Sequence, residues 1–146
     1  MPTDALLAYV HHLAVFGIAA ILAAEAALLS GPLPADRVRA LARWDAAYGG
    51  FAVLALAAGF VRAVYGAKGW DFYAGNPVFW IKIGLFVVIG LISIAPTLKV
   101  ARWRRSGEGA PEPERQHARR LVIVQAALFA LMPLAAALMA RGWGFR

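Results

Sequence analysis

Cysteine is absent from this chain of 146 residues, so it has neither a disulfide framework nor a thiolate ligand for a metal or redox centre. Charged residues are also scarce, at 16% against about 25% in soluble proteins. Hydrophobic residues make up 62%. This composition is typical of an integral membrane protein.

Several catalytic signatures are missing as well. The sequence contains no His-Glu-x-x-His metalloprotease motif and no phosphate-binding loop. Ser30 and Ser93 are the serines near apolar segments, and no histidine is expected at their depth to activate them. We therefore do not expect hydrolytic chemistry.

Four apolar runs are long enough to cross a bilayer, which takes about 20 residues per helix. We place these spans at about 5–29, 46–65, 77–98 and 121–140, separated by glycine- and proline-containing breaks. The prediction is an all-α protein, a single domain folded as an antiparallel up-down-up-down four-helix bundle. A flexible basic loop is expected over about 103–117.

Lysine and arginine are concentrated in two loops that the four-span topology places on one side of the membrane. They are Arg37, Arg39 and Arg43 after the first span, and Lys99, Arg102, Arg104, Arg105, Arg115, Arg119 and Arg120 after the third. Cytoplasmic loops are enriched in such residues, so we expect both termini to lie outside. The same charges favour contact with anionic lipid head groups, and the pattern does not indicate nucleic-acid binding.

A few ionisable residues lie inside the spans, where each costs on the order of 3 kcal/mol unless it faces partners or water. They are His11, His12, Glu25, Arg62 and Lys82. At about 1.5 Å of rise per residue, His11 lies roughly 9 Å inside its span and Lys82 roughly 8 Å inside the third. With Arg62 they share the outer half of the bundle.

Helical phase groups the polar residues further, because residues 14 apart fall on nearly the same face of a helix. We predict two inward-facing layers, an outer one of His11, Arg62 and Lys82 and an inner one of Glu25, Tyr48 and Gln125. No acid within the predicted spans lies at the outer depth, so an anionic or electron-rich ligand is the expected missing partner. Simpler roles stay open for these residues. Arg62 and Lys82 can extend their charged ends to the lipid head groups, and His11 can form one hydrogen bond in the core. Glu25 can pair with Arg43 or Arg120.

The segments at 62–69 and 76–82, with the early His11-His12 pair and a closing Met139-Ala140-Arg141-Gly142, closely resemble a bacterial family of small predicted membrane proteins described only as a domain of unknown function. The resemblance covers essentially the whole chain. It implies no activity.

A more distant resemblance is to HemJ-type protoporphyrinogen oxidases and CopD-like membrane proteins. His11 or His12, Trp80 and Lys82 match the HemJ pattern in type and order, which implies binding of heme b or a related porphyrin and an oxidoreductase activity. Neighbouring helical residues point about 100° apart, so His11 and His12 cannot ligate opposite faces of one iron. Three arrangements remain: an iron with a single histidine ligand, an iron held by a histidine and Met139, or a heme shared across a homodimer. In each, Arg62 and Lys82 would lie near the propionate groups of the heme and neutralise them.

Two other classes of function compete with heme binding. In the first, the same residues line a path for a small solute, a proton or copper, with His11 and His12 as metal ligands beside Met132 and Met139. In the second, the protein is a non-catalytic membrane scaffold whose polar residues only specify packing. If the purified protein is coloured, heme binding is favoured over both the transport and the scaffold functions.

Overall fold

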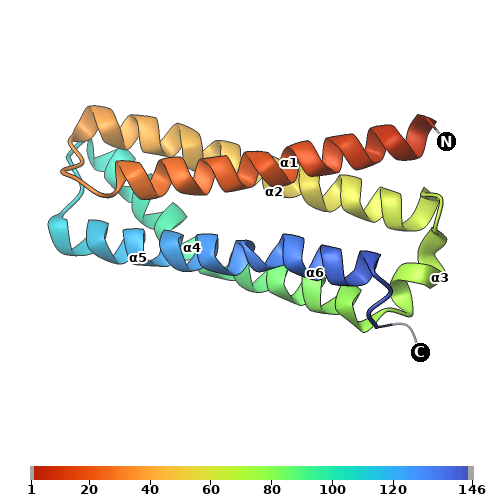
Figure 1. The fold of residues 1–146 in the computed structure, drawn as a ribbon. Coiled ribbons are helices and arrows are strands. Elements are labelled where there is room, and N and C mark those ends of the chain that lie inside the picture. The colour runs from red at the N-terminus through yellow and green to blue at the C-terminus, as the bar shows by residue number, and fades with distance from the viewer. Residues whose placement is uncertain (1, 145–146) are drawn as a thin grey trace.

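A computed structural model describes residues 2–144 as helices joined by short connections (Figure 1). The helices are α1 (Pro2–Leu28), α2 (Ala35–Tyr65), α3 (Gly69–Ala74), α4 (Pro77–Ser106), α5 (Glu112–Phe129) and α6 (Leu131–Ala140). Helices α1, α2 and α4 and the combined α5–α6 segment are each long and apolar enough to cross a membrane. The predicted all-α four-helix bundle is confirmed.

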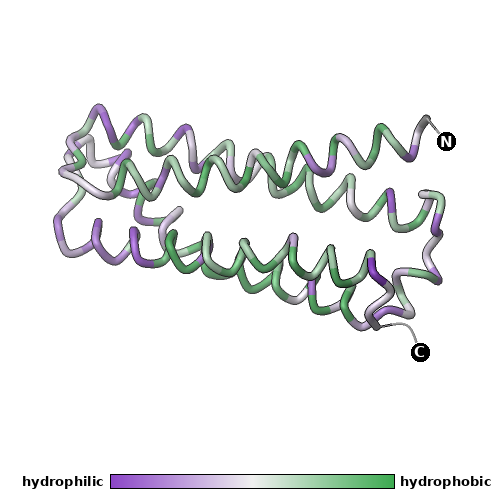
Figure 2. Tube along the Cα trace, in the orientation of Figure 1, coloured by the Kyte–Doolittle hydropathy of each residue, from purple (hydrophilic) through white to green (hydrophobic). Residues whose placement is uncertain are grey.

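The bundle has two distinct ends. Both ends of the described chain and the short helix α3 lie together at one end, which we call the terminal end (Figure 1). The α1–α2 and α4–α5 connections lie at the other, which we call the basic end because the arginine-rich segments are there. Hydrophilic residues gather at both ends and hydrophobic residues between them (Figure 2), as expected for a bundle that crosses a bilayer.

The helices extend beyond the predicted spans at the basic end. Helix α2 begins at Ala35 instead of residue 46, because Val38 and Leu41 are buried while Arg37 and Arg39 stay exposed. This amphipathic first part continues the helix past the apolar run. As a result, Asp45 lies inside α2 and not in a loop.

The predicted flexible loop over 103–117 is much shorter in the structure, because helices α4 and α5 take up most of it. The side chain of Trp103 is buried, and its Nε1 donates to Glu114 Oε2 at 2.9 Å. The backbone nitrogen of Ala110 donates to the carbonyl of Leu33 at 2.9 Å. These contacts fix the remaining connection, 107–111, against the α1–α2 connection.

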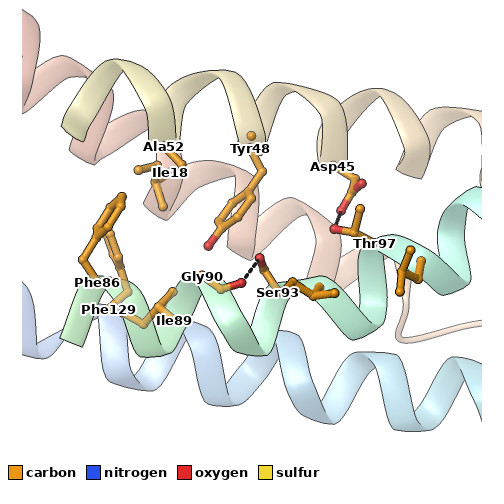
Figure 3. A pocket seen from close by; sticks show the side chains of 13 residues that line it. Ile18, Asp45, Tyr48, Ala52, Phe86, Ile89, Gly90, Ser93, Thr97 and Phe129 are labelled. Carbon is orange, nitrogen blue, oxygen red and sulfur yellow. Dashed lines mark hydrogen bonds between the residues drawn. The ribbon is translucent and has the colours of Figure 1, made fainter. Parts of the chain in front are cut away.

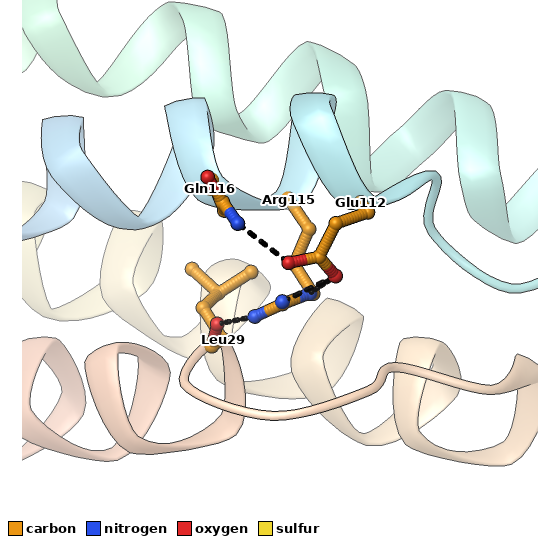
Figure 4. Close-up of polar contacts among 4 residues, drawn as sticks. All are labelled: Leu29, Glu112, Arg115 and Gln116. Carbon is orange, nitrogen blue, oxygen red and sulfur yellow. Dashed lines mark hydrogen bonds and ion pairs between the residues drawn. The ribbon is translucent and has the colours of Figure 1, made fainter.

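A buried arginine holds the basic end together (Figure 4). Arg115 Nη1 donates to the carbonyl oxygen of Leu29, just past the last residue of α1, and its Nη2 pairs with Glu112 Oε2 at 2.5 Å. Gln116 donates to the other oxygen of Glu112 at 2.6 Å. A cation at a helix C-terminus satisfies free carbonyl groups and complements the helix dipole.

Packing is tighter toward the basic end than toward the terminal end. Helix α5 contributes five buried residues, whereas α6, its continuation, contributes none. Among the residues of α1 with described side chains, the first buried one is Ala14. Helix α6 contacts α4 and α5 but does not approach α1 or α2 within the described chain. The terminal half of the bundle is therefore less tightly closed.

Candidate functional site

His11 is held at the terminal end by a hydrogen bond that joins α1 to α2. Its Nδ1 lies 2.9 Å from the carbonyl oxygen of Ala55, and because a carbonyl can only accept, Nδ1 carries the proton. Gly59 lies beside the ring, so that a Cβ there would be 3.0 Å from His11 Cε1. The fixed tautomer leaves Nε2 with a free lone pair, the state in which a neutral histidine binds a metal.

Arg62 also lies at this end, and it has an acidic partner that the sequence analysis did not foresee. Its Nε is 3.6 Å from Asp4 Oδ1, and both side chains are 32% exposed. Asp4 lies just outside the predicted span, so the inference that the outer layer has no acidic partner of its own is wrong for Arg62. Helix α1 starts at Pro2, not residue 5, and this brings Asp4 into its first turn, opposite the last turn of α2.

Lys82 on α4 is the third residue of the predicted outer layer, which lies at the terminal end and which we call the terminal layer from here on. Its positive charge and that of Arg62 both act on the imidazole of His11, and the two cations act on each other. The Lys82 side chain is half-buried. Ion pairs within the described chain involve Arg62, Arg102 and Arg115 but not Lys82. The layer therefore keeps one unneutralised cation.

The other predicted site residues make different contacts. His12 is exposed, with its Nδ1 2.5 Å from the carbonyl oxygen of Ala8 in its own helix. Its ring meets that of His11 edge-on, with centroids 5.9 Å apart. Trp80 is 51% exposed, and its Nε1 donates to the carbonyl oxygen of Ala74 at 2.9 Å. Met139 is partly buried on α6.

Trp80 belongs to an aromatic cluster around α3 and the start of α4. Its ring centroid is 6.4 Å from that of Trp70 and 5.4 Å from that of Phe79. Exposed tryptophans at a helix end are typical of the membrane–water interface. No group of three or more histidine, cysteine, aspartate or glutamate side chains suited to a metal ion occurs within residues 2–144.

The inner layer lies toward the basic end and faces inward as predicted. Glu25, Tyr48 and Gln125 are all buried. The alternative in which Glu25 pairs with Arg43 or Arg120 is wrong, because no ion pair within the described chain involves Glu25 and its Oε1 is buried without a hydrogen-bond partner there. Glu25 instead interacts electrostatically with Asp45 on α2.

The two polar layers are separated by an apolar stretch. The buried residues of α1 between His11 and Glu25 are Ala14, Ile18, Ile21 and Leu22. Ile89 of α4 and Phe129 of α5 are part of the same core. The arrangement favours two separate sites over a single polar path across the bundle.

The inner layer borders a cavity of about 330 Å³ between α2 and α4 (Figure 3). Asp45, Tyr48, Ser93 and Thr97 supply its polar groups. Thr97 Oγ1 donates to Asp45 Oδ1 at 2.7 Å, and Ser93 Oγ donates to the carbonyl of Gly90 at 2.7 Å. Asp45 and Thr97 were not among the residues predicted from the sequence. Asp45 precedes Tyr48 by three residues, so a helix begun earlier would have placed both on one face.

Comparison with known proteins identifies a family for this chain. Neither the curated proteins nor the solved structures contain a match to this chain. Residues 3–144 match the family described as predicted membrane protein DUF2214. Since that match covers nearly the whole sequence and the structure has four helices able to span a membrane, the chain belongs to the DUF2214 family of predicted membrane proteins.

Proposed function

We propose that the protein binds heme b or a related porphyrin in the terminal half of the bundle, with His11 as the axial ligand. The observation that carries the proposal is the hydrogen bond from His11 Nδ1 to the Ala55 carbonyl, which orients Nε2 as a ligand atom. Ligating histidines almost always donate their other nitrogen to a carbonyl or a carboxylate in this way. His12 lacks such cross-helix support.

The charges of the terminal layer suit the acidic groups of a porphyrin. Lys82 is half-buried without an ion-pair partner, and Arg62 has only the distant contact to Asp4. Propionate carboxylates would neutralise these cations and form charge-assisted hydrogen bonds. A buried cation without a partner is costly, so a ligand of opposite charge would stabilise the layer.

In this half of the bundle the packing leaves side chains partly exposed, and a flat ligand could cover them. Helix α6 has no buried residue, and Met132 and Met139 are only partly buried. Met139 or a second copy of the chain is the proposed source of any sixth ligand, the latter requiring a homodimer. Bound heme would supply one-electron redox chemistry, and a HemJ-like oxidoreductase activity is the corresponding proposal.

The test is the absorption spectrum of protein purified in mild detergent from heme-replete cells. We expect a strong near-ultraviolet porphyrin band that is lost in His11→Ala and retained in His12→Ala, its matched neighbour. Lys82→Ala should weaken the band. Added imidazole should restore it in His11→Gly, because the small ligand can occupy the space beside Gly59 that the ring has left.

Two results would overturn the proposal. One is a colourless protein that takes up no added heme, which would leave the transport and scaffold functions as the alternatives. The other is a band of undiminished intensity in His11→Ala, which would remove His11 as the ligand. Circular dichroism on each variant separates loss of heme from loss of folding.

We further propose that the protein resides in a bacterial inner membrane with the terminal end outside. Support comes from the charges, since the basic end carries the arginines around the α1–α2 and α4–α5 connections and cytoplasmic loops are enriched in such residues. These arginines would contact anionic lipid head groups.

A further inference from the structure

We infer that the cavity between α2 and α4 binds a small lipophilic cation, with Asp45 as its counter-ion. This site is separate from the proposed heme site, because the buried apolar residues Ala14 and Ile18 lie between the two layers on α1. The cavity volume of about 330 Å³ falls at the lower end of the range for small-molecule sites, roughly 300–1,000 Å³.

The lining of the cavity changes from apolar to polar along its length (Figure 3). Phe86 and Phe129 lie at one end, and Asp45 and Thr97 lie at the other, with Tyr48 between them. A ligand that fits such a lining has an apolar body and a polar head. Tyr48, which lies between the two ends, adds an aromatic ring that can make favourable electrostatic contact with a cation.

The charge at the polar end identifies the head group. Asp45 accepts a hydrogen bond from Thr97 but forms no ion pair within residues 2–144. Glu25 is only 5% exposed, its Oε1 has no hydrogen-bond partner in the described chain, and it acts electrostatically on both Asp45 and Tyr48. Two acidic groups thus lie in one layer with no cation paired to either, and a cation bound beside Asp45 would stabilise its carboxylate.

An organic cation fits better than a metal ion. Hard metal ions take six or more oxygen ligands, carboxylates among them, and no cluster of three or more potential metal-binding side chains occurs in the described chain. Most of the lining is apolar, including Ile18, Phe86 and Ile89. A protonated or quaternary amine with a hydrocarbon or aromatic body matches this surface.

The cavity also reaches the lipid-facing surface of the bundle. Ile94 and Leu98, which line it, are 51% and 61% exposed. In a protein that spans a bilayer, such side chains face the acyl chains. A ligand would enter laterally from the membrane, so it must be lipophilic as well as cationic.

The experiment compares two probes of the same shape, benzyltrimethylammonium and its uncharged isostere neopentylbenzene, in which carbon replaces nitrogen. Titration calorimetry on the full chain in mild detergent should show saturable binding of the cation. We expect the isostere to bind about tenfold more weakly or worse, because a charge near a partly buried carboxylate is strongly favoured. Asp45→Asn should remove this preference, and Glu25→Gln should reduce it by a smaller factor.

Substitutions at two glycines of α4 provide a matched pair that does not depend on the acids. A Cβ at Gly90, which lines the cavity, or at Gly84, which does not, would meet no atom within 4 Å. Gly90→Leu should therefore weaken the binding of both probes, and Gly84→Leu should leave it unchanged. This pair also tests the site if Asp45→Asn fails to fold.

Equal affinity for the two probes in the unsubstituted protein would overturn the inference and indicate an apolar site that lipid or detergent fills. Absence of saturable binding would do the same, as would cation binding that Asp45→Asn leaves intact. Cation binding should persist in His11→Ala, and the porphyrin band should persist in Asp45→Asn, so failure at one site is distinguishable from failure at the other.

Discussion

The imidazole Nδ1 of His11 and the carbonyl oxygen of Ala55 lie 2.9 Å apart and join α1 to α2 near the terminal end. Gly59 follows Ala55 by four residues and lies beside the same carbonyl, which accepts the helical hydrogen bond from its backbone nitrogen. The missing side chain at Gly59 gives the imidazole room to reach that carbonyl. The position of the histidine therefore depends on a glycine in the opposite helix.

Gly59→Ala should displace the His11 ring and destabilise the protein relative to a matched control. The new Cβ would lie 3.0 Å from Cε1 and 3.1 Å from Nδ1 of His11, and such overpacking typically costs about 1–3 kcal/mol. Gly50→Ala is the control, because a Cβ there meets nothing within 4 Å. It should stabilise α2 by up to about 1 kcal/mol through helix propensity. Thermal unfolding in detergent measures both, and equal stability of the two variants would contradict the contact.

The inward faces of the long helices could be predicted from the sequence because they depend only on helical periodicity. Glu25, Tyr48 and Gln125 are buried where the spacing places them. Helix ends could not be predicted in the same way. Hydropathy ends a span at its first charged residues, whereas the backbone continues its hydrogen bonds into the interface, and this is why Asp4 and Asp45 were missed.

Contacts between helices depend on their axial register, which a single sequence does not specify. The bond of His11 to a backbone carbonyl has no sequence signal, because every residue of α2 carries such a group. A break in the last span did have a signal. Pro133 cannot donate a backbone hydrogen bond and clashes with the carbonyl four residues earlier, at Phe129, and α5 ends there.

Asp4 and Arg62 should show only weak coupling in stability. Their contact is 3.6 Å long and both side chains are about a third exposed, at 32%, a setting in which ion pairs contribute about 0–1 kcal/mol. A double-mutant cycle with Asp4→Asn and Arg62→Gln in detergent should therefore give a coupling energy below about 1 kcal/mol. A coupling of several kcal/mol would mean that the pair is better shielded than its exposure implies.

The topology is testable with single cysteines, since the chain has none of its own. Ala67 and Glu108 are exposed in the connections at the terminal and basic ends. Ala67→Cys should react with a membrane-impermeant thiol reagent added from outside, and Glu108→Cys only after the membrane is opened. The neighbouring glycines Gly69 and Gly107 are poorer positions, because their φ angles of +73° and +70° disfavour a side chain. Labelling of both cysteines in intact cells would contradict the four-span topology.

Among the arginines of the basic end, Arg115 should contribute most to the free energy of unfolding. Its side chain is 7% exposed, and it donates to the carbonyl of Leu29 while pairing with Glu112. Arg115→Met keeps most of the apolar stem but leaves the Leu29 carbonyl without this donor and leaves Glu112 with only its bond from Gln116, which costs about 1–3 kcal/mol.

Arg119, one turn further along α5 and exposed, supplies the matched control. Arg119→Met removes the same charge and the same head group, so changes in net charge or in lipid attraction affect both variants equally. Its free energy of unfolding should differ from that of the unsubstituted protein by no more than about 0.5 kcal/mol. Thermal unfolding in one detergent at fixed salt measures the difference. If Arg115→Met were no less stable than Arg119→Met, the Leu29 carbonyl would have another partner, and the closure of the basic end would not depend on this side chain.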